Sequence, residues 1–459
     1  MTETPLNREQ FLARYRDVDS PESAVRVNSV LALCDAQDVP TGPLSDVAVL
    51  IKDNIEALGL PGTAGSLALK PHPATRDAEL VTRLRAAGAD IVGSTNLSEW
   101  ANIRSTRSAS GWSAVGGLTG NPWQLDRSAG GSSSGAGAAV AAGLVSLAIG
   151  TETDGSIVCP ASLNGVVGLK PTVGSISVDG VVPISKSQDT PGPLTTDVRL
   201  AAVAFEVMSG KQGAVEAVDN SKTVSSKLRV GVADAWLTGH TETDAVFAKA
   251  VEVVARLVAS VDKSDVPAAG NEEHTDEYTV LKCELKDDLG AYLTQRLPNH
   301  SLNSLQAVVD FNNAHAEVEL QHFGQEIFDA ALTTQGRNSD EYREARKRNL
   351  EWAITKCFAP AFEKFDLLVA PAYGPAWKSD LIIGERGAGG VSTTAAAIAG
   401  YPLLCIPMGL VQDMPVGLII SGSAGDEARM LALGAELMKH LGTRPDDGYV
   451  PQLRLATRG

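Results

Sequence analysis

Residues 130–171 read GGSSSGAGAAVAAGLVSLAIGTETDGSIVCPASLNGVVGLKP, a run dominated by small and apolar residues. Serines occupy positions 132–134 between glycines. The alanine-rich segment 136–150 that follows them predicts a smooth helix able to pack close to its neighbours, because alanine is the best helix former. Another serine, Ser156, lies in a glycine-flanked turn ahead of a proline. Residues 165–172 then predict a strand that ends at a proline.

The segments on the amino-terminal side of this stretch follow a strand–helix–strand order. Residues 7–36 have leucine and valine at helical spacing and predict a helix. Residues 47–55, VAVLIKDNI, form a β-branched apolar run typical of a buried strand. An amphipathic helix is expected over 77–88, ending in a glycine, and a further strand over 89–96. This order is the signature of an α/β fold.

The carboxyl-terminal half continues the pattern with a helical interruption. Composition becomes polar over 209–227, which predicts a loop, and residues 276–358 predict charged helices. We therefore expect one large α/β domain in which 235–360 form a mostly helical insertion. The remaining expected elements are strands at 228–234, 365–375, 402–409 and 414–422, and helices at 243–260 and 425–441.

Composition limits the classes of function. The chain has 459 residues and a formal net charge of −16. Binding of nucleic acid or of an anionic membrane needs clustered lysine and arginine, so we expect neither partner. The first residues, MTETPLNREQ, show no signal-peptide pattern and no apolar run could cross a bilayer, which predicts a cytoplasmic protein. The five cysteines are scattered and never in a C-x-x-C spacing, as expected for reduced thiols: Cys34, Cys159, Cys283, Cys357 and Cys405.

The serines at 132–134 allow several interpretations. Serines directly before a helix are typical amino-terminal caps. A phosphate-binding loop is disfavoured, because G-x-x-x-x-G-K-[ST] is absent and a G-x-G-x-x-G pattern fails at Val140. Residues 131–135 satisfy G-x-S-x-G, but a nucleophile elbow needs an apolar strand running into it, and 124–129, QLDRSA, do not predict one.

A lysine in the first predicted strand is a candidate base. Lys52 interrupts an otherwise apolar run, and because a strand alternates its faces, Lys52 and Asp53 should point opposite ways. A lysine buried without a carboxylate has a lowered pKa. Acting as a base near neutral pH requires a drop of roughly three pKa units. The alternative is that Lys52 extends to solvent or pairs with an acid that the sequence does not reveal.

Three motifs together resemble one enzyme family. They are IKDN at 51–54, GGSSSG at 130–135 and DGSIVCP at 154–160, and the stretch 130–171 resembles the signature region of the amidase signature family almost end to end. The 24 positions from Ser132 to Ser156 agree with that family's spacing. The resemblance implies a single α/β domain over 1–459, with a central mixed sheet covered by helices on both faces. It places the catalytic core within 37–210 and suggests that the helical insertion shapes the substrate channel.

The resemblance also implies roles for individual residues. Ser156 would be the nucleophile that forms an acyl-enzyme. Ser132 would bridge Ser156 and Lys52, and Lys52, neutral at rest, would be the base. In the family this bridge involves a cis peptide bond, here at one of the two bonds flanking Ser132. The expected proton transfer, from the nucleophile through a second side chain, corresponds to that of a Ser–His–Asp triad with different residues.

The remaining polar groups of the motifs receive supporting roles. The resemblance implies an oxyanion hole built from the backbone N–H groups of Thr153, Asp154, Gly155 and Ser156. Ser133 and Ser134 are expected to cap the following helix and to move no proton. Cys159 has no base in view and is expected to be an inert packed thiol.

Two departures from the family pattern bear on the substrate. Many members have two glycines before the nucleophile and an arginine two residues after it, where this chain has Asp154 and Val158. In the glutamine-dependent tRNA amidotransferase that arginine helps hold the glutamine carboxylate. Residues 151–162 instead resemble the peptide amidase branch, as do 108–117, 185–193, 283–293 and 309–328. We expect ammonia release from C-terminal peptide amides or similar primary amides. An aryl or alkyl amidase for anilide-type substrates and the amidase-like component of a tRNA amidotransferase stay open as alternatives.

Substrate contacts are expected at two positions. Asp154 could contact a substrate group near the scissile bond or cap a turn, and Trp112 could line the pocket. The interpretation we favour for Trp112, as for Trp123, is that it pins the long loop before the serines. The sequence requires no organic cofactor and no metal, and it leaves monomer and homodimer open.

Overall fold

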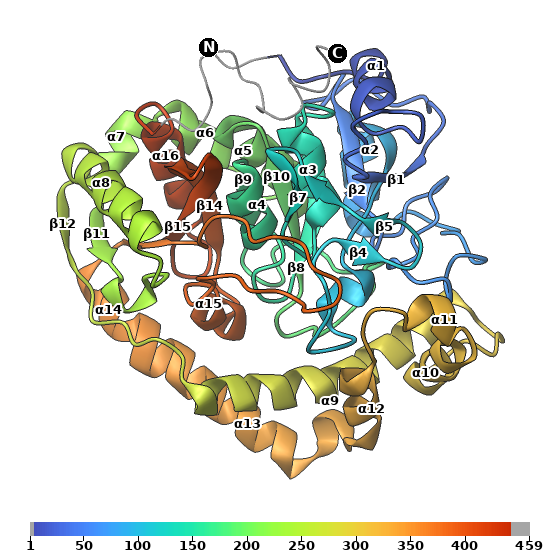
Figure 1. The fold of residues 1–459 in the computed structure, drawn as a ribbon. Helices are drawn as coiled ribbons and strands as arrows, with labels where there is room; N and C mark the ends of the chain where they lie inside the picture. The colour runs from blue at the N-terminus through green and yellow to red at the C-terminus, as the bar shows by residue number, and fades with distance from the viewer. Residues whose placement is uncertain (1–3, 442–459) are drawn as a thin grey trace.

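The structure, a computed structural model, describes residues 4–441 and is organised around an eleven-stranded mixed β-sheet (Figure 1). The two ends of the sheet contain parallel pairs and its centre is antiparallel. In spatial order the strands are β1 (Val30–Leu33), β3 (Asp90–Thr95), β2 (Ala48–Lys52), β8 (Leu147–Glu152), β10 (Thr190–Thr195), β9 (Val167–Lys170), β14 (Leu403–Val411), β15 (Met414–Ser421), β13 (Leu367–Pro371), β11 (Arg229–Val232) and β12 (Ser260–Lys263).

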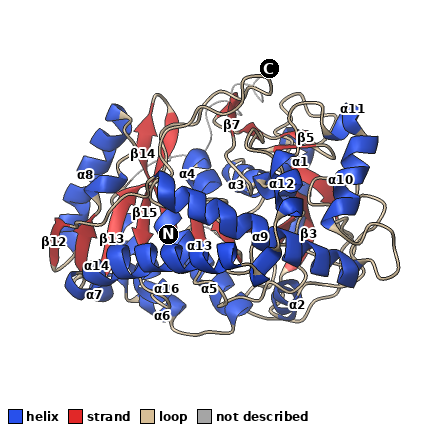
Figure 2. Ribbon diagram, turned by 90° about the horizontal axis from the view of Figure 1, so that it is seen from below, coloured by secondary structure: helices blue, strands red, loops and turns tan. Residues whose placement is uncertain are grey.

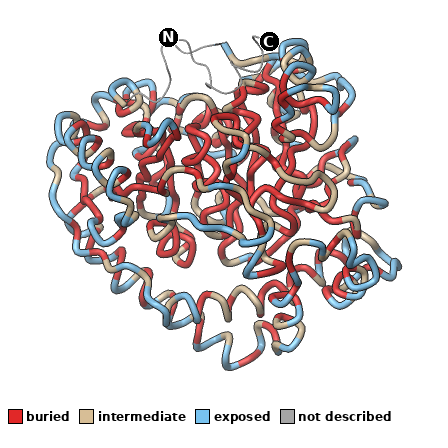
Figure 3. Tube along the Cα trace, viewed as in Figure 1, coloured by how far each residue is buried: buried red, intermediate tan, exposed pale blue. Residues whose placement is uncertain are grey.

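Helices cover both faces of this sheet, so two hydrophobic cores lie against it, and buried residues concentrate there (Figure 3). The expected single α/β domain with a mixed sheet is confirmed. One face carries α2 (Glu79–Ala86), α5 (Val198–Ser209), α6 (Ala214–Asp219), α7 (Ser221–Ser225), α8 (Thr241–Leu257) and α16 (Glu427–Leu437). The other carries α1 (Arg8–Val18), α3 (Ser134–Ala141), α4 (Val158–Asn164), α14 (Ala359–Lys364) and α15 (Thr394–Ala399).

The alternation of β2 assigns its lysine to one of these faces. Val49 and Ile51 lie in the core beneath α2 and α5, whereas Leu50 lies in the core beneath α3 and α4. Successive strand side chains point to opposite faces, so Lys52 shares the face of Leu50. The strand therefore directs Lys52 toward the loop that precedes α3.

The segment 235–360 is mostly helical, with β12 as its one strand among the described elements. Its helices α9 and α13 lie side by side along the lower side of the molecule in Figure 1, and Figure 2 shows the same pair from below. The ion pair between Arg348 and Asp276, 2.6 Å from N to O, joins them. The segment contains α9 (Asn271–Arg296), α10 (Leu305–Ala314), α11 (Ala316–Glu319), α12 (Glu326–Thr333), α13 (Asp340–Leu350) and a π-helix (Glu351–Phe358).

The helix predicted over 7–36 is wrong beyond its first third. The helix α1 ends at Val18, and the chain returns as the edge strand β1. Asp19 explains the change, because its buried carboxylate accepts the backbone N–H groups of Ser29 at 2.9 Å and Val30 at 2.7 Å. These contacts across ten residues fold the segment back, and helical periodicity cannot report them.

The helix predicted after the serines is also too long. It ends at Ala141, Gly143 adopts a left-handed φ of +69°, and residues from Leu147 onward form β8. Glycine favours this conformation at a helix end. The apolar residues that follow are buried in the sheet, where short apolar runs of helix and strand look alike in sequence.

Two loop predictions need correction as well. Residues 209–227 contain the short helices α6 and α7 rather than only loop. Residues 124–128 form the strand β7, which was not predicted, and it pairs with β6 (Gly120–Asn121) in a small hairpin outside the main sheet. A second small hairpin pairs β4 (Trp112–Ser113) with β5 (Gly117–Leu118).

Candidate active site

Lys52 lies at the end of β2 with its side-chain nitrogen fully buried against hydroxyl and carbonyl groups. Its Nζ lies 2.7 Å from Ser132 Oγ and 2.9 Å from Thr151 Oγ1, and it also donates to the Thr151 carbonyl at 3.2 Å. Asn54 Nδ2 donates to the same Thr151 hydroxyl at 3.0 Å. The structure thus joins Lys52 and Ser132 directly, although 80 residues separate them in sequence.

The surroundings of Lys52 favour its neutral form. Burial lowers the pKa of Lys52 to about 7, while the nearby carboxyl groups of Glu152 and Asp189 oppose that shift. Asp53 does not pair with the lysine, because its carboxylate accepts the N–H groups of Gly62 at 3.0 Å and Thr63 at 2.9 Å. The two neighbouring side chains therefore point apart, as strand alternation predicts.

The loop before α3 brings Ser132 toward the loop that carries Ser156. The Gly131–Ser132 peptide bond is cis, which distinguishes it from the Ser132–Ser133 bond. The Ser132 carbonyl accepts the Ser98 N–H at 3.1 Å, and the Ser133 N–H donates to the Ser156 carbonyl at 3.1 Å. A Cβ at position 131 would lie 2.3 Å from Ser98 Oγ, so only glycine fits there.

The expectation that Ser133 and Ser134 cap α3 is wrong, because neither side chain accepts an N–H of that helix. Ser133 Oγ donates to the Thr151 carbonyl at 3.1 Å and accepts the Thr151 N–H at 3.2 Å. Ser134 Oγ donates to the carbonyl of Gly130. Both side chains tie the loop to its neighbours instead of to the helix.

Alanine at these two positions should separate stability from catalysis. We expect Ser134→Ala to retain most of the activity. We expect Ser133→Ala to lower the free energy of unfolding by about 1–3 kcal/mol, because it leaves the buried N–H of Thr151 without its side-chain acceptor. Denaturant unfolding and kcat measured on both variants check this. A drop of more than tenfold in the kcat of a fully folded Ser134→Ala protein would contradict it.

Ser156 sits at a turn whose shape is held by a buried acid. Glu152 Oε2 accepts the N–H groups of Ile157 at 2.7 Å and Val158 at 2.9 Å, which fixes the start of α4. Gly155 has a φ of +80°, and a Cβ there would come within 2.6 Å of the Tyr373 hydroxyl. The turn therefore requires glycine directly before the serine.

Backbone N–H groups at this turn are available to a ligand. Within residues 4–441, the N–H groups of Thr153, Asp154, Gly155 and Ser156 donate to no protein acceptor. The Thr153 side chain is engaged, since its Oγ1 donates to Asp189 Oδ1 at 2.6 Å. Convergent N–H groups of this kind stabilise a developing oxyanion.

A cavity of about 260 Å³ opens above Ser156. Trp377 and Glu385 come to it from a distant loop, and Leu281 comes from α9. No lysine, arginine or histidine is among the described residues that line it. The full lining is Ala101, Asn102, Ile103, Ser110, Gly131, Thr153, Asp154, Ser156, Cys159, Ile184, Leu281, Tyr373, Trp377 and Glu385.

The two tryptophans of the loop before the serines do not line this cavity. Trp112 packs edge-on against Phe323, with ring centroids 5.2 Å apart, and against His322 at 5.0 Å. Trp123 Nε1 donates to the Asn164 carbonyl at 2.9 Å. Both side chains pin the loop, and the structure does not place Trp112 at the cavity as a substrate contact.

Asp154 lines the cavity beside a second acid that the sequence did not single out. Its Oδ2 accepts the Thr394 hydroxyl at 3.2 Å, and its carboxyl group meets that of Glu277 from α9. Gln188 Nε2 donates to Glu277 Oε1 at 3.0 Å. Burial, followed by the charge of Asp154, raises the pKa of Glu277 well above its usual range. Two buried carboxyl groups in contact do not both ionise near neutral pH.

Some of the site residues that the sequence analysis did not single out have a local sequence signal and others do not. Asn54 lies two residues after Lys52, so strand alternation could have placed it on the same side. Thr151 borders the motif that contains Ser156. Asp189 lies within 185–193, a segment that resembles the peptide amidase branch, whereas no local pattern marks Glu277. Both reach the site only through the tertiary fold.

Comparison with known proteins identifies the family. The Amidase family model matches residues 9–431, which is nearly the whole chain. This chain belongs to the amidase signature family. The amidase-family component of the glutamyl-tRNA(Gln) amidotransferase of Symbiobacterium thermophilum is 33% identical over 438 residues, covering 89% of this chain and 86% of that protein.

Solved structures of other amidase signature proteins superpose on this amidase over most of its length. Native peptide amidase from Stenotrophomonas maltophilia gives a TM-score of 0.85 at 36% identity, covering 95% of this chain and 93% of that chain. The corresponding glutamyl-tRNA(Gln) amidotransferase component of Thermotoga maritima gives 0.70 at 25% identity, covering 96% and 93%. The protein is an amide hydrolase of this family.

Other chemistry at the site of this amidase has less support from its residues. Burial raises the pKa of the Cys159 thiol to about 12, so this cavity thiol stays protonated. Over residues 4–441, no group of three or more histidine, cysteine or acidic side chains is arranged to hold a metal ion.

Among the helices of residues 4–441, none combines the length and apolar character needed to cross a membrane.

Proposed function

We propose that this amidase hydrolyses primary carboxamides, in particular the C-terminal amides of peptides, and releases ammonia. Ser156 is the nucleophile, Ser132 relays protons and Lys52 is the base. The observation that carries the proposal is the 2.7 Å contact between the buried Lys52 Nζ and Ser132 Oγ. A neutral lysine at this position accepts a proton that Ser132 has exchanged with the nucleophile.

The reaction proceeds through two acyl-transfer steps. Ser156 Oγ attacks the amide carbonyl and gives its proton to Ser132, which passes its own proton to Lys52. The N–H groups of residues 153–156 stabilise the resulting oxyanion. As the C–N bond breaks, the Lys52 ammonium returns its proton through Ser132 to the leaving nitrogen, which departs as ammonia. A water molecule then releases the acyl group from Ser156 by the same relay in reverse.

Two observations support a peptide amide over free glutamine as the substrate. The fold agrees better with peptide amidase than with the amidotransferase component, with TM-scores of 0.85 and 0.70. The described lining of the cavity also has no cationic side chain to hold a free α-carboxylate, and Val158 provides none. Acceptor groups such as the Asp154 carboxylate suit the N–H groups of a peptide instead.

A three-substrate assay tests this proposal. We expect purified protein to release ammonia from an amidated dipeptide, with kcat/KM at least about tenfold higher than for glutamine, since the cavity leaves a free carboxylate unpaired. Aniline release from an anilide is measured in parallel. A preference for the anilide would establish the aryl amidase alternative. Ammonia from glutamine alone would contradict both hydrolase assignments and indicate a component of an amidotransferase.

A further inference from the structure

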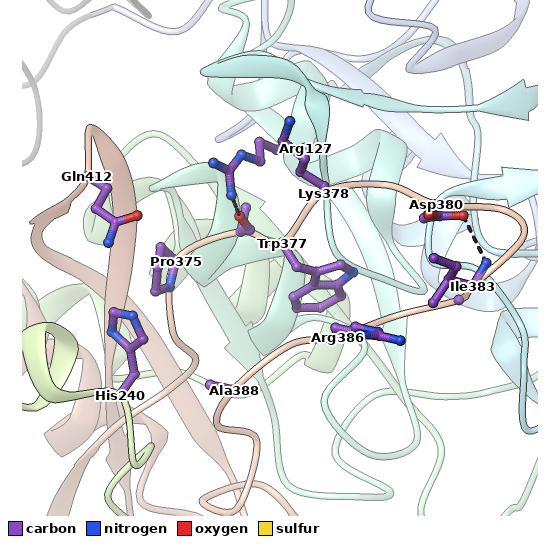
Figure 4. Close-up of a pocket in the computed structure, with 12 residues that line it drawn as sticks. Arg127, His240, Pro375, Trp377, Lys378, Asp380, Ile383, Arg386, Ala388 and Gln412 are labelled. Atoms are coloured by element: carbon purple, nitrogen blue, oxygen red, sulfur yellow. Dashed lines mark hydrogen bonds between the residues drawn. The ribbon is translucent and has the colours of Figure 1, made fainter.

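A basic cleft of about 420 Å³ lies beside the catalytic cavity (Figure 4). Its charged lining consists of Arg127, Lys378, Arg386 and Asp380, with His240 at one side. The cleft is therefore lined by three cationic side chains and one carboxylate. The chain as a whole has 55 acidic and 39 basic residues and a net charge of −16. A local excess of positive charge against this background is a feature that attracts anions.

The backbone forces two of these cations together. Arg127, at the end of hairpin β6–β7, forms an isolated antiparallel bridge with Lys378. Residues paired in this way project their side chains from the same face, and like charges in such a pair destabilise the fold. An anion bound between them would relieve that repulsion.

The protein itself neutralises this charge only weakly. The Arg127 guanidinium donates to the neutral Ala376 carbonyl at 2.9 Å and to Gln124 Oε1 at 3.3 Å. Lys378 meets Asp126 at 3.4 Å, but both side chains are more than half exposed, so the pair contributes little. Among the described residues, no carboxylate lies within ion-pair distance of Arg127 or Arg386.

The one acid of the cleft is already engaged in shaping the loop. Asp380 Oδ1 accepts the N–H groups of Ile382 at 2.8 Å and Ile383 at 2.9 Å. Figure 4 shows this carboxylate turned toward Ile383, on the far side of Trp377 from His240. The acceptor capacity of the cleft is therefore small compared with its donor capacity.

The cleft adjoins the catalytic cavity through a shared wall. Trp377 lines both spaces. The next part of the same loop divides its charges between them, because Glu385 lines the cavity and Arg386 lines the cleft. The cleft and the catalytic cavity therefore adjoin at the Trp377 indole.

We propose that this cleft binds a carboxylate of the substrate, carried by a side chain upstream of the amidated residue. The inference rests on the proposed peptide amide function and assigns a substrate preference to it. Arg127, Lys378 and Arg386 supply the donors, and arginine suits carboxylates because its planar guanidinium can hold both oxygens.

Matched peptides test the assignment. The substrates are two amidated tripeptides that differ only in glutamate or glutamine at the residue before the amidated one. For the wild type we expect KM to be about fivefold lower for the glutamate peptide, near the upper value for half-exposed ion pairs. The double variant R127Q/R386Q should bring the KM ratio close to one. The control R343Q removes an exposed arginine paired with Asp340 on α13 and should keep the ratio. Equal KM values in the wild type, or a preference that survives in R127Q/R386Q, would overturn the proposal.

A binding measurement separates this inference from the proposed function. If neither peptide amide releases ammonia, the proposed function fails, and succinate titrated calorimetrically into wild type and R127Q/R386Q tests the cleft itself. Binding by the wild type alone would then support an anion site. No binding, or equal binding by both proteins, would overturn it. Succinate binding without any KM difference between cleaved peptides would assign the cleft to a free anion and overturn the substrate role.

Discussion

Replacing Ser156 with alanine should lower kcat for an amidated dipeptide by at least about 10⁴-fold, because the acyl-enzyme can no longer form. The protein should remain folded, since the side chain faces the cavity and the turn is held by Glu152 through backbone N–H groups. Ammonia release measured against a blank checks the loss, and circular dichroism checks the fold.

Cys159→Ala is the matched control for this experiment. It removes the thiol that lines the cavity three residues further along, whose pKa of about 12 keeps it protonated. We expect Cys159→Ala to retain activity within a few-fold of the wild type. Full activity in Ser156→Ala, or its loss in a folded Cys159→Ala protein, would reject Ser156 as the nucleophile.

Lys52 should make catalysis depend on pH. Burial lowers its pKa to about 7, so the neutral base predominates above that pH and is lost below it. We expect log kcat/KM to rise with a slope near one up to about pH 7 and then to level off. Lys52→Met should reduce the rate by about 10²–10⁴-fold, the usual contribution of a general base.

A second buried lysine provides the control for the pH profile. Lys170 is also fully buried, and its Nζ donates to the Tyr401 carbonyl at 2.6 Å rather than to either serine. In correctly folded Lys170→Met protein, the midpoint of the pH profile of kcat/KM should stay near 7. A rate that does not change between about pH 5.5 and 8.5 would contradict the role of Lys52.

Most strands were predictable because their residues are buried on both faces. The run 47–55 and the pair 402–409 and 414–422 are nearly continuous apolar sequences, which parallel or central strands require. One error arose from a contact between residues ten or more positions apart, and another from a local glycine stop. Asp19 turned the expected helix over 7–36 back into a strand, and Gly143 ended α3 early.

The candidate site divides in the same way. The motifs marked Lys52, Ser132 and Ser156 through their spacing, and strand alternation separated Lys52 from Asp53. The expectation that Ser133 and Ser134 cap the helix is wrong, because Ser133 bonds to Thr151 of the neighbouring strand β8 and Ser134 bonds to the Gly130 carbonyl in its own loop. Short-range preference for a cap cannot reveal those competing partners.

The sequence by itself determined the family, the α/β class and the residue types available for an amide-cleaving relay, because these follow from motifs and from the burial pattern of single strands. Only the tertiary structure decided which groups meet. Complete burial lowers the pKa of Lys52 to about 7, and the fold brings Glu277 to Asp154 and Arg127 to Lys378. Desolvation and charge pairing depend on distances between segments far apart in the chain, and no local pattern encodes those distances.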